Sequence, residues 1–281
     1  ILIESDGYTV GTEEKVLFTG AYKITGTGET TNTIVVSGGT HQIRIENINI
    51  SKPVTGPFVL ANNASVTLTI SGTNTITANA TFAGIEVPAG CVLDVKGSGT
   101  LNVTGGTSSA GIGARGSDST TGTLGTVIIH SGTILATGGS NGAGIGDSRN
   151  GLGGTVTIYG GTIQAKSSGN GAGIGEGGNN GTDSAGVQIT IYGGCISAGG
   201  STAEVGYGKG AGANTTVAVY GGSITSLNGK TLLGAASGNV LTESTHSFWS
   251  NKFSYSTIDA IYIDGVDQNI SSYHYREGAV N

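Results

Sequence analysis

The sequence repeats itself at intervals of about 30 residues, and this feature limits the possible folds most strongly. Four ten-residue segments align without gaps, and their starts are separated by 29, 33 and 28 residues. They read VIIHSGTILA (127–136), VTIYGGTIQA (156–165), ITIYGGCISA (189–198) and VAVYGGSITS (217–226). Apolar and polar residues alternate on both sides of a central pair that ends in glycine. This pattern is typical of two short strands joined by a turn.

A second motif lies between these segments. It reads AGIGAR (110–115), AGIGDS (143–148), AGIGEG (172–177) and, in a degenerate copy, AEVGYG (203–208). Units of this length with three short strands are typical of a parallel β-helix, whereas a propeller or a sandwich needs longer repeats or denser turns. We therefore predict an all-β chain. Residues 1–238 are expected to form a right-handed parallel β-helix, a solenoid of about seven or eight coils.

The alternation also predicts which residues form the core. Val156, Ile158, Ile163 and Ala165 should face inward, with their equivalents in the other copies stacked above and below them. The isoleucine of the glycine motif should form a third inward column, made by Ile85, Ile112, Ile145, Ile174 and Val205. We expect the glycines around that column to permit positive φ angles and a tight corner.

The repeat stops near residue 239. Residues 246–278 contain seven of the 16 aromatic residues of the chain. Because the open end of a stack of strands is an exposed sheet edge that must be covered, we predict that residues 239–281 form an aromatic-rich C-terminal cap. A small appended module that binds a ligand or docks to a partner is the alternative.

The charge and composition exclude some classes of partner. The chain has 12 Lys and Arg against 18 Asp and Glu, for a net charge of −6, and it has no basic run that would indicate nucleic acid binding. No apolar stretch approaches the roughly 20 residues of a membrane-spanning helix. Richness in Gly, Thr, Ser and Asn with few charges is typical of extracellular proteins. We therefore expect an extracellular or cell-surface location.

One aromatic position stands out in the repeat. His130, Tyr159, Tyr192 and Tyr220 occupy the same outward position in four successive copies, so we expect them to stand about 4.8 Å apart on the solvent side. Such a column can stabilise the array through ring contacts between strands. It can also act as a flat aromatic strip that packs against the apolar faces of sugar rings, or as a contact surface for a protein partner.

Carboxylates follow the glycine motif. Asp147 and Glu176 occupy one position in adjacent copies, Glu204 lies close by in the next copy, and Arg149 lies just past the same corner. Close carboxylates raise each other's pKa or bind a cation, so Asp147, Glu176 and Glu204 are a candidate calcium site. Asp147, Glu176 and Arg149 are candidate catalytic residues of a polysaccharide lyase or glycoside hydrolase. Alternatively, Asp147 and Glu176 are solvated corner residues.

At GAGIG (142–146 and 171–175) and at YGGTI (159–163) with its two variants, the sequence resembles a family of secreted bacterial surface proteins. These proteins carry glycine-rich, pectate-lyase-like β-helices and are often labelled carbohydrate-binding domain-containing proteins. The resemblance covers about residues 40–230. It implies the β-helix fold and a secreted or cell-surface glycan binder. It brings no fixed set of catalytic residues with it.

The leading functional hypothesis is a non-catalytic, extracellular carbohydrate-binding or adhesive module of a bacterial surface or secreted protein. Its expected partner is a polysaccharide or surface glycan, and calcium is the one cofactor considered. The second hypothesis is an enzyme that acts at the corner of Asp147 and Glu176. The third is a self-assembling subunit of a surface layer or fibre.

Overall fold

The structure is a computed structural model that describes residues 1–79, 81–116, 122–178, 186–210 and 214–234, together with the backbone of three short strands at 240–242, 262–263 and 266–267. Every regular element in this part of the chain is a β-strand. No helix of the described residues is long and apolar enough to cross a membrane. The all-β class predicted from the alternation is confirmed.

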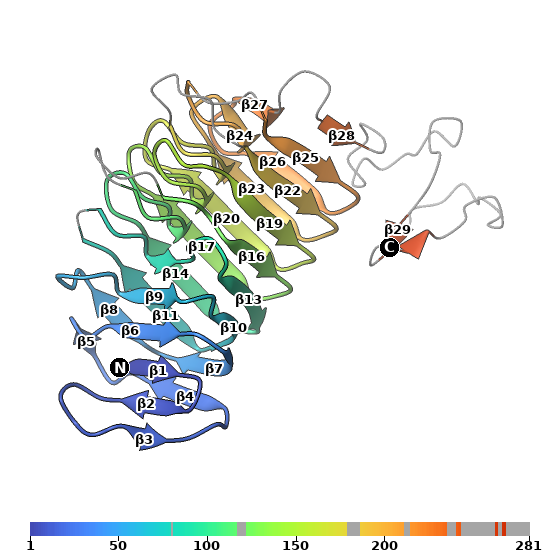
Figure 1. Cartoon of the computed structure of the whole chain (residues 1–281). Coiled ribbons are helices and arrows are strands. Elements are labelled where there is room, and N and C mark those ends of the chain that lie inside the picture. The colour runs from blue at the N-terminus through green and yellow to red at the C-terminus, as the bar shows by residue number, and fades with distance from the viewer. Residues whose placement is uncertain are drawn as a thin grey trace.

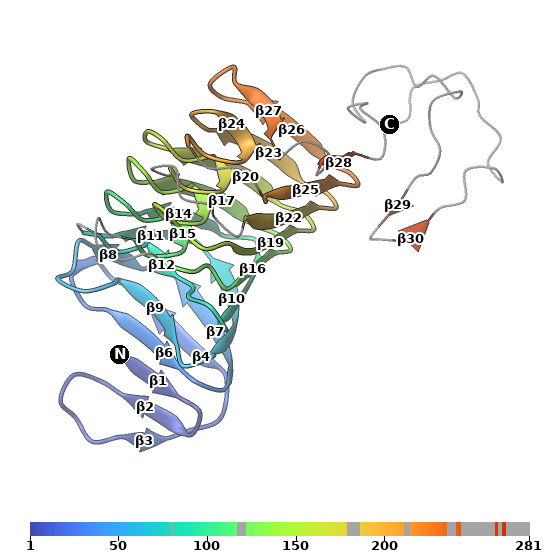
Figure 2. The same cartoon turned by 45° about the horizontal axis from the view of Figure 1, so that its top comes forward.

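Most strands belong to three sheets, here named sheets A, B and C, and the chain visits them in turn (Figure 1). Counted over the described strands, the cycle A, B, C runs seven times, from β6 to β26. Each strand pairs in parallel with its equivalents in the cycles before and after it. Figure 2 shows these cycles stacked in chain order. The arrangement is consistent with a parallel β-helix, while the right-handed sense of the coils stays a prediction.

The strands have the following bounds. Sheet A contains β3 (Val16–Leu17), β2 (Gly7–Thr9), β1 (Leu2–Glu4), β6 (Ile34–Ser37), β9 (Phe58–Ala61), β12 (Ile85–Glu86), β15 (Ile112–Gly113), β18 (Ile145–Gly146), β21 (Ile174–Gly175), β24 (Ala203–Gly206) and β27 (Thr231–Gly234). Sheet B contains β4 (Tyr22–Thr25), β7 (Thr40–Glu46), β10 (Ser65–Ser71), β13 (Val92–Gly97), β16 (Thr126–Ile129), β19 (Gly154–Ile158), β22 (Val187–Ile191), β25 (Thr216–Val219) and β28 (Val240–Thr242). Sheet C contains β5 (Glu29–Thr30), β8 (Asn49–Ser51), β11 (Thr73–Thr77), β14 (Thr100–Thr104), β17 (Thr133–Gly138), β20 (Thr162–Ser167), β23 (Cys195–Gly199) and β26 (Ser223–Ser226).

The core lies between the three sheets and is made of aliphatic columns. Val156, Ile158, Ile163 and Ala165 are each at most 1% exposed. Val156 pairs with Val127 before it and Ile189 after it, so the same inward position is apolar in neighbouring cycles. The five residues predicted for the third column, Ile85, Ile112, Ile145, Ile174 and Val205, are all fully buried. The predicted core is confirmed for these residues, but in the last copy only Val217 is buried, whereas Val219 and Ile224 are half-buried and Ser226 is exposed.

Glycine forms the corner after four of these five residues, whereas Ile85 is followed by Glu86. Gly146 has φ +134° and Gly175 has φ +129°, a region that residues with a Cβ rarely adopt. A Cβ built on Gly146 would lie 2.1 Å from the carbonyl oxygen of Gly175 in the next cycle. The corner therefore needs glycine both for its backbone angle and for the close approach of neighbouring coils.

The two ends of the stack differ from its middle. At the N-terminal end, β1, β2 and β3 pair antiparallel and extend sheet A. At the other end, β28 still pairs in parallel with β25, so the regular stacking reaches Thr242. Beyond it only the short antiparallel pair β29 (Tyr262–Ile263) and β30 (Val266–Asp267) is described. The rest of the predicted cap, 239–281, lies outside the described residues, and the domain division stays a prediction.

Candidate functional site

The predicted ring column is present on the outer face of sheet B. His130, Tyr159, Tyr192 and Tyr220 each follow the last residue of a sheet B strand. The ring centroids of successive residues are 4.8, 5.0 and 5.2 Å apart, and the ring planes differ by 3°, 8° and 14°. The expected spacing is therefore confirmed.

Backbone register holds the rings in line. The amide of Tyr159 donates to the carbonyl of Ile129, that of Tyr192 to Ile158, and that of Tyr220 to Ile191, each at 2.8 Å. Each ring is thus one residue past a buried isoleucine or, for Tyr220, past the half-buried Val219, which packs against the core. Because the core columns set the strand positions, the rings are aligned by the same packing that forms the fold.

The rings present their edges, not their faces, along most of the column. Tyr159 stacks on His130 and on Tyr192, and Tyr192 stacks on Tyr159 and on Tyr220. The faces of Tyr159 and Tyr192 are therefore both covered. The expectation of a strip that offers flat ring faces is wrong for these two residues, because strands about 5 Å apart bring consecutive rings into contact. The column therefore presents a series of ring edges to solvent, and Tyr159 is still 41% exposed.

Hydroxyl and amide groups border the ring edges. The outward positions two and four residues before the tyrosines carry Thr157 and Thr155 on β19, and Thr190 and Gln188 on β22. All four are exposed or half-buried. They supply hydrogen-bond donors and acceptors on the same face as the rings. His130 is the first ring of the column in chain order, and its Nε2 lies 3.3 Å from Asp94 Oδ1.

The turns after the rings carry no side chain that could cover them. Tyr159, Tyr192 and Tyr220 are each followed by two glycines. A Cβ on Gly193 would lie 2.7 Å from the carbonyl oxygen of Tyr159, so the turns approach each other too closely for any other residue. The glycine pairs therefore add no side chain beside the rings in these three turns.

The carboxylate corner has a different character from the one expected. Asp147 is 1% exposed, and its two oxygens accept hydrogen bonds from the amides of Ser148 at 2.9 Å and Gly153 at 2.8 Å. Burial raises the pKa of Asp147 to about 7, with a further increase from the nearby Glu176, although the two amide bonds act in the opposite direction. The Asp147 carboxylate therefore holds the two ends of the loop 147–153 together.

Glu176 and Glu204 are buried as well, and each joins two cycles. Glu176 is 2% exposed and accepts a hydrogen bond from the hydroxyl of Thr215, a residue of the following cycle. Glu204 is fully buried and accepts hydrogen bonds from the amides of Gly200, Asn228 and Lys230 and from the Ser226 hydroxyl. These carboxylates thus organise the corners of the stack.

The interpretation of Asp147 and Glu176 as solvated corner residues is wrong, since both are buried. The structure also does not bring Asp147, Glu176 and Glu204 together as ligands of one ion. Among the described residues, no group of three or more His, Cys, Asp or Glu side chains could hold a metal. Arg149 is half-buried at the corner, and its amide donates to the carbonyl of Ser108. Calcium binding stays a prediction without a ligand set in this part of the chain.

Comparison of the chain with protein-family models, curated proteins and solved structures gave no match. The function must therefore be argued from the site itself. Of the two predicted sites, only the ring column lies on the surface, where a macromolecule can reach it.

Proposed function

We propose that this chain is a non-catalytic carbohydrate-binding or adhesive module of a secreted or cell-surface protein, built on a right-handed β-helix. The glycan binds along the ring column of sheet B. The observation that carries the proposal is the regular spacing of four aligned rings, 4.8 to 5.2 Å apart, on the outer face of sheet B.

The spacing suits an extended polysaccharide. One ring per coil gives a repeat close to the length of one sugar unit in an extended chain. Ring edges supply apolar C–H groups and the phenol hydroxyls supply hydrogen bonds, so each coil can contact one sugar in a similar way. The hydroxyls of Thr157 and Thr190 and the amide of Gln188 add polar contacts on the same strands. Binding energy then accumulates over several weak, equivalent contacts.

The burial of the carboxylates argues against the enzyme alternative. A general acid or base must come within hydrogen-bond distance of the bond it cleaves. Asp147 and Glu176 are at most 2% exposed, and both oxygens of Asp147 already accept backbone hydrogen bonds. A polysaccharide on the surface cannot contact these groups without opening the corner.

One observation favours the third hypothesis, self-assembly. The edge strand β3 and the residue after it expose Val16, Leu17 and Phe18, by 48%, 75% and 41%. An exposed apolar edge strand is a template for pairing with another chain. Light scattering separates a monomer from an assembly. A charged substitution, Leu17→Lys, should dissolve any assembly that uses this edge.

Affinity electrophoresis against a panel of polysaccharides tests the proposal, with the same samples assayed for released sugar. Retardation without product supports a binding module. The double variant Tyr159→Ala and Tyr192→Ala should lose retardation. The control variant Thr162→Ala and Gln164→Ala, which changes exposed residues of sheet C, should keep it. Equal retardation of both variants would remove the ring column from consideration, and sugar release would favour the enzyme.

A further inference from the structure

The position that holds the rings continues toward the N-terminus as a row of cations. In register, Lys23 pairs with Arg44, Arg44 with Thr69, and Thr69 with Lys96. Lys96 in turn adjoins His130, because Val95 pairs with Ile129 and the His130 amide donates to the Val95 carbonyl. One outward row, here named the cation–ring row, therefore runs along sheet B through Lys23, Arg44, Thr69, Lys96, His130 and the three tyrosines.

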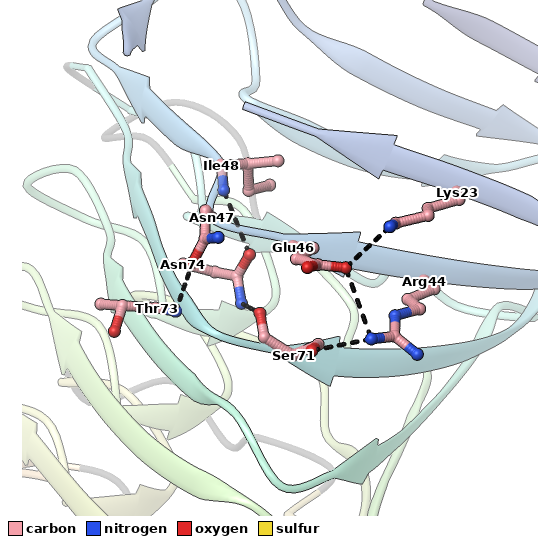
Figure 3. A network of polar contacts seen from close by, with 8 residues as sticks. All are labelled: Lys23, Arg44, Glu46, Asn47, Ile48, Ser71, Thr73 and Asn74. Atoms are coloured by element: carbon pink, nitrogen blue, oxygen red, sulfur yellow. Dashed lines mark hydrogen bonds and ion pairs between the residues drawn. The ribbon is translucent and has the colours of Figure 1, made fainter. Parts of the chain in front are cut away.

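The cations of this row point to solvent and are only partly neutralised. Lys23 Nζ lies 3.0 Å and Arg44 Nη2 lies 3.4 Å from the same Glu46 oxygen, and Arg44 also donates to the hydroxyl of Ser71 at 2.9 Å (Figure 3). One carboxylate thus serves two cations, which leaves a net positive charge. Ser71 and Glu46 hold the Arg44 guanidinium in place.

Lys96 is the cation nearest the rings. It is exposed, and it forms no ion pair with the residues that the structure describes. Asp94, the nearest acidic residue on the same face of β13, lies against His130 instead. The Lys96 ammonium is therefore available to a ligand that also contacts the His130 end of the column.

The charge of this row is positive, whereas the net charge of the whole chain is negative. The chain has a net charge of −6, yet the eight positions of the cation–ring row hold three cations and no acidic residue. Successive positions are about 4.8 Å apart, so the cations and the rings can be reached by one extended polymer that lies along the stack.

We infer that the ligand is an acidic polysaccharide, one whose sugars carry carboxylates, which binds along the cation–ring row. Its sugars contact the ring edges, and its carboxylates pair with Lys96 and with the Lys23–Arg44 end. This inference rests on the proposed function, since it names the chemical class of the same ligand. Exposed ion pairs are weak singly and are screened by salt, so affinity should fall as salt rises.

The test uses polygalacturonate and alginate, each beside the same polymer with its carboxyl groups reduced to alcohols. Affinity electrophoresis compares the unmodified chain with Lys96→Gln and with Lys166→Gln, a matched loss of charge at an exposed position of sheet C. The acidic polymers should bind several-fold more tightly than the reduced ones at low salt. Lys96→Gln should weaken binding of the acidic polymer about three-fold and leave the reduced polymer unaffected. Lys166→Gln should change neither.

Two outcomes overturn the inference, and they can be told apart. If acidic and reduced polymers bind equally, or if Lys96→Gln behaves like Lys166→Gln, the acidic class is wrong while the proposed function stands. If neither these polymers nor the neutral panel are retained, the proposed function fails and this inference fails with it.

Discussion

Replacing Gly146 with alanine should destabilise the stack more than replacing the exposed Gly28 does. Gly146 has φ +134°, and a Cβ there would lie 2.1 Å from the carbonyl oxygen of Gly175 and 3.0 Å from its nitrogen. That oxygen accepts the amide of Asp147 at 2.7 Å. The added methyl must therefore push β18 from β21 and weaken this bond.

The size of the effect follows from these two terms. A non-glycine residue in such a backbone region costs about 1–3 kcal/mol. A backbone hydrogen bond contributes about 1 kcal/mol. We therefore expect Gly146→Ala to lower the free energy of unfolding by about 2–4 kcal/mol, measured by urea unfolding followed by circular dichroism.

Gly28→Ala is the matched control for this measurement. Gly28 has no positive φ, and a Cβ added to it meets no atom within 4 Å. This variant should stay within about 0.5 kcal/mol of the unmodified chain. If the two variants unfold at the same urea concentration, the argument that the corner requires glycine is refuted.

Two further predictions concern the candidate sites. The folded chain keeps a proton on Asp147, whose pKa is raised to about 7, while the unfolded chain releases it near the ordinary value of 3.8. The free energy of unfolding should therefore fall as the pH rises from about 4 to about 7, by on the order of 4 kcal/mol, and Asp147→Asn should remove most of this decrease. Urea unfolding over this pH range measures the effect. If the free energy of unfolding changes with pH equally in the unmodified chain and in Asp147→Asn, the prediction is contradicted. Tyr192 stacks on two rings, so Tyr192→Ala should cost about 1–3 kcal/mol in thermal unfolding while Tyr192→Phe costs little; similar losses for the two variants would show that stacking is not the stabilising term.

The sequence predicts those features of the fold that follow from alternation and register. Ile158 is buried and Tyr159 is outward because they are neighbours on a strand, and the spacing of the copies then aligns Tyr159 with Tyr192. Gly146 could be placed at a corner because it ends an apolar motif that recurs in four successive cycles, as AGIG in three of them and AEVG in the fourth. These inferences need only the alternation of apolar and polar residues and the spacing of the copies.

The carboxylates could not be placed in this way. Asp147 sits between glycine and serine, a context typical of a surface loop, yet the amide of Gly153 folds back onto it. The partners of Glu204 include Asn228 and Lys230, which belong to the following turn of the stack. Burial here depends on how loops fold over corners, which strand alternation does not encode.

The cation end of the row was also missed by sequence reasoning. The upstream copies are weak, and the register that aligns Arg44 with Thr69 and Thr69 with Lys96 became visible only from the strand pairing. The signal was present in the outward positions of the segments 43–50, 68–78 and 93–103, but it required an alignment across copies of different length.

Hydroxyl-radical footprinting of the chain with and without a retained polysaccharide tests the central claim most directly. The measurement reports the oxidation of individual rings. Bound glycan should protect Tyr159, Tyr192 and Tyr220, while Phe18, an exposed ring at the N-terminal end of the structure, should be oxidised equally in both samples. Unchanged oxidation of the three tyrosines in a sample that retains the glycan would show that the ligand binds elsewhere and would contradict the account.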